Sequence, residues 1–169
     1  MFRRHVSLLS NSVRANAISA VEKYLTVQED GFDRRYGQDL IRAVEFKAEG
    51  IQEIETAFGL PMTPDVALTF PFHVTEMACN GVGSCHGGVL SSLADVFTTV
   101  HLWGLEPGRK HVSVNLELDF MCAALTNTRV QCNTVVMRRG KKLAFTSFSF
   151  VDERTGQLLA KGSHTKAYI

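Results

Sequence analysis

The chain has 169 residues, of which 45% are hydrophobic and 21% are charged, and its formal net charge at pH 7 is +1. This composition is typical of one globular domain with a full hydrophobic core. The small net charge argues against a nucleic-acid partner, because proteins that hold nucleic acids are usually strongly basic. No apolar run approaches the roughly 20 residues that a membrane span needs, so we expect no span.

The first twenty residues carry three arginines and several serines, and no acid precedes Glu22. This composition is typical of a mitochondrial import peptide, which would give a mitochondrial location. The alternative is a helix of the folded domain over 12–27, because apolar residues recur there at helical spacing, and then the location is cytoplasmic or mitochondrial. We divide the chain into an N-terminal helical and loop extension over 1–39 and a main domain over 40–169.

The next segments are less regular. Residues 29–39 are polar and interrupted by glycine, which predicts a loop, and 40–47 are a short strand candidate. The stretch 48–64 mixes acids with scattered apolar residues, which predicts a helical turn or an excursion whose role stays open. Residues 66–75 alternate apolar and polar, which predicts a strand, and Pro71 indicates an edge strand or a strand end.

A helix is predicted over roughly 87–103, and an antiparallel sheet follows it. Short turns separate four strand candidates, at 111–120, 128–137, 143–151 and 158–169. In the first of them the apolar residues from Val112 through Val114 to Phe120 alternate on one face, which leaves Ser113 on the polar face. One long helix among these strands indicates an α+β fold in which an antiparallel sheet wraps around a single helix.

The start of the helix has an unusual composition, with His86, Gly87 and Gly88 in succession. A helix N-terminus presents unpaired backbone N–H groups and a partial positive charge, and glycine lets a ligand approach the backbone closely. Gly87 is therefore a candidate donor to an oxyanion, the alternative being a plain tight turn between loop and helix.

Asp95 interrupts the apolar pattern of the same helix, and taken alone it is typical of a solvated carboxylate. At about 1.5 Å of rise per residue it lies roughly 12 Å along the axis from Gly87. A carboxylate that acts on a carbonyl bound at Gly87 must therefore come from a second chain. A two-fold dimer with antiparallel helices would bring the two groups together, and an active site would lie between subunits.

Several motifs occur together in the order and spacing of a known family, and the sequence resembles the hotdog-fold acyl-CoA thioesterases of the thioesterase superfamily member 2 type. The bacterial phenylacetate-pathway thioesterases are more distant relatives. The resemblance covers about half of the chain, residues 80–167, and the N-terminal half matches only loosely. The motifs are Asn80, HGG at 86–88, Asp95, Ser113 in HVSV, GKKLAFTS at 140–147 and GSHTK at 162–166.

The resemblance implies a hotdog fold that pairs into homodimers and commonly into dimers of dimers. It implies that the Gly87 N–H and the Asn80 amide polarise the thioester carbonyl. Asp95 of the partner subunit would activate a water as general base, with direct nucleophilic attack as the alternative, and Ser113 would position that water. His86 is a further candidate, which either touches the substrate or holds the loop through the backbone.

The substrate implied is an acyl-CoA with a fatty or aromatic acyl group, and no cofactor is implied, because coenzyme A belongs to the substrate. The resemblance places His164 near the site, unless it is a structural strand histidine, and a cationic hairpin could meet the phosphates of coenzyme A, unless it is an ordinary charged tip. The residues proposed to contact the substrate are Gly88, Arg138, Arg139, Lys141, Lys142, His164 and Lys166.

The chemistry agrees with these residue types. An aspartate is ionised at pH 7, and a thiol leaving group with a pKa near 8.5 departs without a strong acid. A GxSxG elbow is absent from the sequence. The alternatives are a non-catalytic acyl-CoA binding subunit, or a hotdog hydroxyacyl-thioester dehydratase that would use His86.

Cysteines and large aromatic residues complete the set of candidates. The four cysteines form no CxxC pair and no tight spacing with histidine, so we expect free thiols in a reducing compartment, with no metal. Cys79 and Cys85 flank the candidate loop, and we interpret both as packing residues, because no base at motif spacing would activate them. We expect Phe97, Trp103 and Phe120 in the core, the alternative being the lining of an acyl tunnel.

Overall fold

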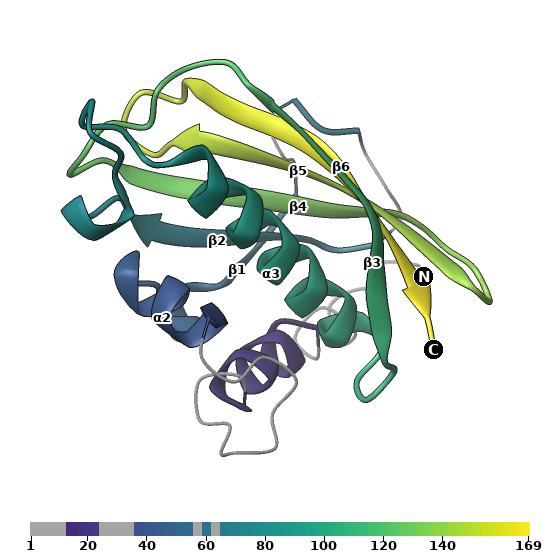
Figure 1. The fold of residues 1–169 in the computed structure, drawn as a ribbon. Helices are drawn as coiled ribbons and strands as arrows, with labels where there is room; N and C mark the ends of the chain where they lie inside the picture. The colour runs from purple at the N-terminus through teal and green to yellow at the C-terminus, as the bar shows by residue number, and fades with distance from the viewer. Residues whose placement is uncertain (1–12, 24–35, 56–58, 62–64) are drawn as a thin grey trace.

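The computed structural model describes residues 13–23, 36–55, 59–61 and 65–169 (Figure 1). Residues 13–23 are helical. The elements that follow are α2 (Tyr36–Ala43), the short 3-10 helix η1 (Ala48–Gly50), β1 (Gln52–Ile54), β2 (Ala67–His73), the 3-10 helix η2 (Glu76–Ala78), α3 (Gly87–Leu105), β3 (His111–Phe120), β4 (Arg129–Arg139), β5 (Leu143–Asp152) and β6 (Leu158–Tyr168).

The six strands form one sheet in the order β1-β2-β4-β5-β6-β3, and every neighbouring pair is antiparallel. Figure 1 shows the sheet curving around α3, with α2 and the helix of residues 13–23 on the other side of α3. An antiparallel sheet wrapped around one long helix is the hotdog arrangement. The predicted fold class is therefore confirmed, together with the long helix and the four strands after it.

The core lies between α3 and the concave face of the sheet. Leu93, Phe97 and Val100 of α3 are fully buried and recur at helical spacing, which confirms the expected place of Phe97 in the core. The Phe97 ring stacks on Phe70 of β2 with centroids 4.7 Å apart and meets Phe46 at 4.9 Å. Strand β2 and the segment after α2 thus both pack against α3 at Phe97.

The N-terminal helix packs against the C-terminal part of α3. Val13, Ala17 and Val21 are buried at a spacing of four residues, and Gly104 allows close approach, since a Cβ there would lie 2.8 Å from the Val13 carbonyl oxygen. The Asn16 side-chain amide donates to the Gly104 carbonyl over 3.1 Å. The helix predicted over 12–27 is confirmed over 13–23, while residues 1–12 and 24–27 lie outside the described part of the chain.

The strand predicted over 40–47 is wrong, because the helix α2 occupies its first half and no strand follows there. Leu40, Ile41 and Val44 are buried, and this spacing belongs to one face of a helix rather than to alternate residues of a strand. The loop predicted over 29–39 ends in the same helix at Tyr36, and residues 29–35 lie outside the described part. The boundary expected after residue 39 therefore falls inside α2.

The strand predicted over 66–75 is confirmed as β2, and the role of Pro71 follows from its neighbours. The strand β1 pairs only with residues 67–69 of β2, so β2 is an edge strand at Pro71 on that side. A residue without an N–H can occupy such a position without loss of a ladder bond. The stretch 48–64 contributes η1 and β1, and residues 56–58 and 62–64 of it lie outside the described part.

Candidate active site

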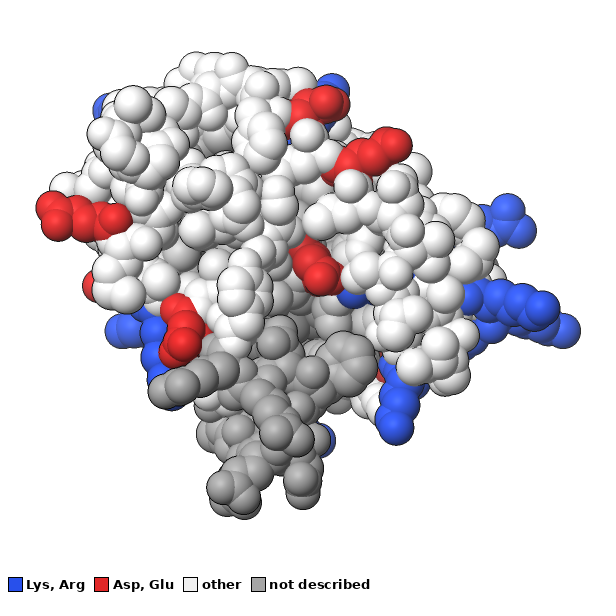
Figure 2. All heavy atoms as spheres, viewed as in Figure 1, with Lys and Arg blue, Asp and Glu red and all other residues white. Residues whose placement is uncertain are grey.

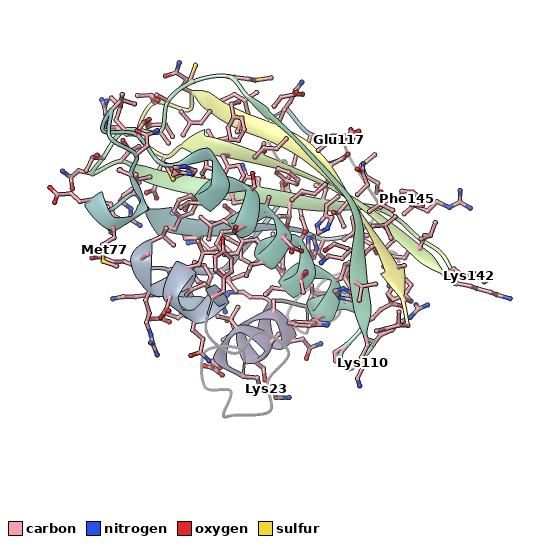
Figure 3. The ribbon with its side chains drawn as sticks, viewed as in Figure 1. Lys23, Met77, Lys110, Glu117, Lys142 and Phe145 are labelled. Atoms are coloured by element: carbon pink, nitrogen blue, oxygen red, sulfur yellow. The ribbon has the colours of Figure 1, made fainter. Side chains whose placement is uncertain are left out.

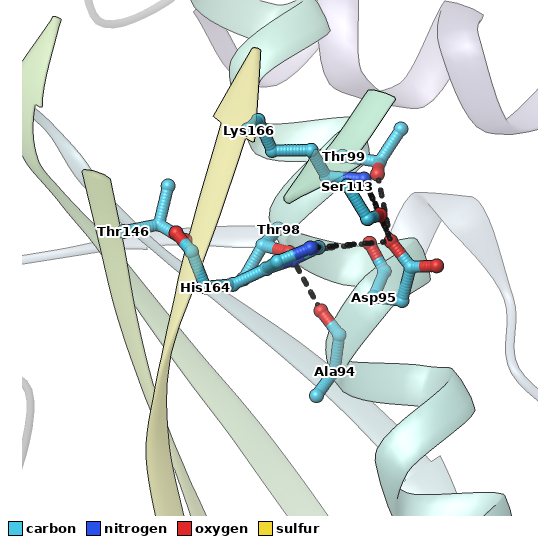
Figure 4. Close-up of polar contacts among 8 residues, drawn as sticks. All are labelled: Ala94, Asp95, Thr98, Thr99, Ser113, Thr146, His164 and Lys166. Atoms are coloured by element: carbon cyan, nitrogen blue, oxygen red, sulfur yellow. Dashed lines mark hydrogen bonds and ion pairs between the residues drawn. The ribbon is translucent and has the colours of Figure 1, made fainter. Parts of the chain in front are cut away.

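Asp95 lies at the middle of α3, and four polar side chains lie close to one oxygen of its carboxylate, Oδ1 (Figure 4). The Lys166 ammonium lies 2.6 Å from Asp95 Oδ1, and the Ser113 hydroxyl lies 3.1 Å from it. His164 Nε2 is 3.7 Å away, and the Thr99 hydroxyl is 3.5 Å away. Figure 4 shows the second carboxylate oxygen pointing away from these partners, and the Asp95 side chain is 45% exposed.

A bulge in β3 turns Ser113 toward Asp95. The register pairs Ser113 with Lys166 but Asn115 with Thr165, so Val114 is an extra residue in the ladder. An inserted residue reverses the alternation of side chains beyond it. Ser113 therefore faces α3, and Leu116 and Leu118 beyond the bulge face the core on the same side. Val114 is 60% exposed, so the prediction that it shares the face of these leucines is wrong.

The hydrogen bonds of this cluster assign donors and acceptors. Ser113 donates its single hydrogen to Asp95, so its oxygen accepts from Lys166 over 3.0 Å. The Thr98 hydroxyl lies 2.7 Å from the Ala94 carbonyl, which can only accept, and 2.7 Å from His164 Nδ1. We assign the Thr98 hydrogen to Ala94 and the His164 proton to Nδ1, which leaves His164 Nε2 unprotonated beside the carboxylate.

The charges in the cluster depend on burial and on mutual attraction. Burial alone would raise the pKa of Asp95, but the Lys166 ammonium, with His164 and Ser113, lowers it below its ordinary value. Burial lowers the pKa of Lys166 against the attraction of Asp95. Burial and Lys166 together lower the pKa of His164 to about 4. At neutral pH the cluster thus holds a carboxylate, an ammonium and a neutral imidazole.

The N-terminus of α3 is organised by His86, which is its N-cap. His86 Nδ1 accepts a hydrogen bond from the Gly88 N–H over 2.9 Å. Among the described residues no hydrogen bond from the Gly87 N–H is recorded, as expected for a first helical residue. A Cβ on Gly87 would lie 3.0 Å from Phe120 Cζ, so close packing is a second reason for glycine here. Phe120 is 57% exposed, and its expected place in the core is wrong.

Asn80 holds the loop that precedes α3. Its Oδ1 accepts hydrogen bonds from the backbone N–H groups of Val82 and Ser84, at 3.1 and 3.3 Å. Its amide group lies 3.2 Å from the Ser84 hydroxyl. One hydrogen of this amide is thus left for another acceptor at the helix N-terminus.

The structure brings most of the candidate residues together as two groups, one around the middle of α3 and one at its N-terminus. Asp95, Ser113, His164 and Lys166 form the first, and the loop residues with Gly87 form the second. Gly87 and Asp95 belong to the same continuous α3, so roughly 12 Å of helix separates them within the chain. The distance argument made from the sequence therefore applies to the folded protein.

The cations proposed for coenzyme A do not form one group. Arg139 makes a bidentate ion pair with Asp65, with two contacts of 3.1 Å, so its guanidinium already has a partner. Lys166 is buried beside Asp95, and its side chain is only 4% exposed. Figure 3 shows Lys142 at the tip of the β4–β5 hairpin, pointing away from the protein, and Figure 2 shows basic side chains at the same edge. Arg138, Lys141 and Lys142 are exposed there as well.

Nucleophilic chemistry by the thiol of Cys85 is disfavoured, because this side chain is buried. Burial, with a contribution from Cys79, raises the pKa of the Cys85 thiol to about 12, which does not suit a nucleophile.

In the described ranges no group of three or more metal-ligating side chains is present. None of the helices in the described part of the chain is both long enough and apolar enough to cross a membrane.

Comparisons with known proteins identify relatives of this chain. The family model of the thioesterase superfamily matches residues 82–159. Mouse acyl-coenzyme A thioesterase 13 is 30% identical over 126 residues, which are 75% of this chain and 90% of the mouse protein. The crystal structure of mouse thioesterase superfamily member 2 is 26% identical with a TM-score of 0.63, and the match covers 94% and 96% of the two chains.

A second solved structure extends the comparison of folds. The Escherichia coli PaaI protein from the phenylacetic acid degradation operon is 21% identical with a TM-score of 0.67, over 95% of this chain and 96% of that one. The solved structures thus show a hotdog fold, and the family model and the mouse relative show an enzyme of the thioesterase class. The chain belongs to the thioesterase superfamily, which confirms the resemblance seen in its motifs.

Proposed function

We propose that the protein hydrolyses acyl-CoA thioesters, with a fatty or aromatic acyl group, to the free acid and coenzyme A. The name of the mouse relative supports this substrate class. The observation that carries the proposal is the Asp95 carboxylate, whose Oδ1 accepts from Lys166 and Ser113 while the side chain remains 45% exposed. A group of this kind is ionised, oriented and open to a water molecule.

The proposed base is Asp95 Oδ2. Because Oδ1 is occupied, a water that approaches the site donates one hydrogen to Oδ2, and the Ser113 oxygen can accept its other hydrogen. The water oxygen then presents a lone pair to the thioester carbon. The thiolate of coenzyme A leaves as such, because its pKa is near that of an ordinary thiol. The proposed reaction uses no cofactor and no metal.

The proposed carbonyl site is the start of α3 in the other subunit. The Gly87 N–H is a free helix-terminal donor, and the Asn80 amide has a hydrogen to spare, so the two can hold the developing oxyanion. Asp95 and Gly87 of one chain lie too far apart to act on one carbonyl. The proposed active site therefore combines Gly87 and Asn80 of one protomer with the carboxylate of its partner.

The edge strand β3 supports the proposed dimer. It is the last strand of the sheet, with one side unpaired in the single chain, and most of its residues are exposed. An exposed edge of ten residues is a template for pairing with another strand. Two-fold pairing through β3 would set two copies of α3 antiparallel. A homodimer is thus proposed, and a dimer of dimers as its further assembly.

The exposed cations Arg138, Lys141 and Lys142 are the proposed contacts for the phosphates of coenzyme A, because lysine and arginine are the usual phosphate ligands.

The proposed compartment is mitochondrial or cytoplasmic. Val13 and Ala17 are core residues, so cleavage of an import peptide after residue 20 would remove part of the core. An N-terminal sequence of the native protein decides between the two.

A thiol-release assay tests the proposed function. Purified protein is given short, medium, long and aromatic acyl-CoAs, and Asp95→Asn is assayed beside it. We expect hydrolysis of at least one class and a loss of about a hundredfold or more in the variant, with the oligomer unchanged. Ligand-dependent stabilisation without turnover would instead identify a binding subunit. Turnover of hydroxyacyl thioesters to enoyl products would identify a dehydratase.

A further inference from the structure

Lys166 is a buried lysine whose position is explained by one contact. Its side chain is 4% exposed, whereas lysines almost always keep their ammonium in water. The ammonium lies 2.6 Å from Asp95 Oδ1 and 3.0 Å from the Ser113 oxygen. A buried charge is costly unless it is paired and hydrogen-bonded, so the pair with Asp95 is what allows Lys166 to lie inside.

This contact determines which atoms of the site remain free. With Lys166 and Ser113 on Oδ1, the second oxygen of Asp95 points away from the cluster (Figure 4). The hydrogen of Ser113 is directed to Asp95, because Lys166 can only donate to the serine oxygen. The lysine thus selects one orientation of the carboxylate and one orientation of the hydroxyl.

We propose that Lys166 is a positioning residue of the thioesterase site, which presents Asp95 Oδ2 as the base and makes the Ser113 oxygen a hydrogen-bond acceptor for the attacking water. The inference rests on the proposed function of Asp95. It gives Lys166 a role in the chemical step rather than in binding the phosphates of coenzyme A.

Of the titratable groups around Asp95 that are named below, only Lys166 is charged at neutral pH. Lys166 and His164 face it from β6, His111 lies nearby on β3, and Thr99 faces it from α3. Burial, with Lys166, lowers the pKa of His111 and that of His164 to about 4 each. Both histidines are therefore neutral at pH 7, and Lys166 is the one cation among these groups.

The sign of the expected pH effect follows from this environment. Burial acts to raise the pKa of Asp95, and the Lys166 ammonium is the main group that lowers it. Without the ammonium the effect of burial would be unopposed by that charge, and the carboxylate would take up a proton at higher pH. The acid limb of kcat/KM would then move to higher pH, because the base must be ionised.

The test compares Lys166→Met, which keeps the length of the side chain without its charge, with Lys161→Met as a matched control on the same strand. We expect kcat for acyl-CoA hydrolysis to fall about tenfold or more in Lys166→Met, with KM within about twofold and the acid limb moved to higher pH. The control should keep the wild-type kcat and profile. A raised KM with unchanged kcat, or a lower kcat with an unmoved acid limb, would overturn the proposal.

A readout without activity separates this inference from the proposed function. The carboxyl carbon of Asp95 is titrated by NMR in wild type and in Lys166→Met, and we expect a higher pKa in the variant even if no substrate is found. An unchanged titration would overturn the pairing. If Lys166→Met does not fold, the Lys166 titration in Asp95→Asn replaces it, and the lysine pKa should fall relative to wild type.

Discussion

The Ser113 hydroxyl donates to the Asp95 carboxylate over 3.1 Å. The extra residue Val114 in β3 allows this contact, because it turns Ser113 toward α3. In a regular strand with the observed pairing beyond the bulge, Ser113 would face away from α3. Bulges occur often beside active sites because they redirect a side chain in this way. The irregularity of β3 is thus a part of the candidate site.

We predict that Ser113→Ala lowers kcat for acyl-CoA hydrolysis about tenfold and leaves the fold intact, because the water loses one acceptor and the carboxylate one donor. The measurement is steady-state thiol release with circular dichroism as a check on folding. Ser163→Ala, on β6 and outside the cluster, is the control and should match wild type. Wild-type kcat in Ser113→Ala would exclude Ser113 from the site.

A single turnover in ¹⁸O-labelled water distinguishes the two roles of Asp95. If Asp95 activates a water, the product acid carries the label in the first turnover. If Asp95 attacks the thioester itself and water opens the resulting anhydride at the Asp95 carbonyl, the first product takes an unlabelled oxygen from the carboxylate, and the label enters the protein. We predict label in the acid and none in Asp95, measured by mass spectrometry of product and peptide.

Gly162 allows β3 to lie against β6. A Cβ at this position would fall 1.9 Å from the Glu117 carbonyl oxygen and 2.6 Å from Phe148 Cζ. We predict that Gly162→Ala lowers the free energy of unfolding by about 3 kcal/mol, the upper range for overpacking, because backbone must move. Urea denaturation measures it, and Gly81→Ala, with nothing within 4 Å of the added carbon, is the control. Equal stability of the two variants would contradict the observed strand spacing.

Three buried histidines predict a loss of stability in mild acid. Burial lowers the pKa of His101, His111 and His164 to about 4 each. In the unfolded chain these histidines titrate near pH 6.5, so between about pH 6.5 and 4 the unfolded state binds more protons than the native state. The free energy of unfolding therefore falls as the pH drops through this window, by up to about 1.4 kcal/mol per pH unit for each histidine.

Urea denaturation at several pH values between 4 and 7 measures this slope. We predict that His101→Gln has a shallower slope than wild type, because one of the three groups is removed. The lowered pKa of Asp95 acts in the same direction but only at lower pH, since stability from a depressed carboxyl pKa is lost when that carboxyl protonates. A slope that stays flat down to pH 4 would contradict the burial of neutral histidines.

Much of the fold could be predicted because its largest elements carry clear periods. The buried residues of α3 recur at helical spacing, and the strands after it alternate between short turns. The short helix α2 could not be predicted, because the apolar positions Leu40, Ile41 and Val44 are too few to define a helical period. Two of them are β-branched, and such residues also favour a strand. Their helical spacing becomes decisive only once they pack against α3.

The candidate site was predictable where it follows a motif and not where it depends on the sheet. Gly87 and Asp95 stand out in the sequence by their place in the helix, and Asn80 follows from the resemblance to the family. The bulge does not, because apolar and polar residues alternate through Val114 without interruption. The pair between Lys166 and Asp95 spans 71 residues, and only the packing of β6 and β3 over α3 brings these charges together.

The central claim is a site made by two protomers, and mixed subunits test it most directly. Asp95→Asn and Asn80→Ala, each inactive alone, are co-expressed in equal amounts, and thiol release is measured per subunit. A shared site predicts about a quarter of wild-type activity, because one site in four combines an intact loop with an intact carboxylate from different chains. A mixture no more active than its two parents would contradict the account.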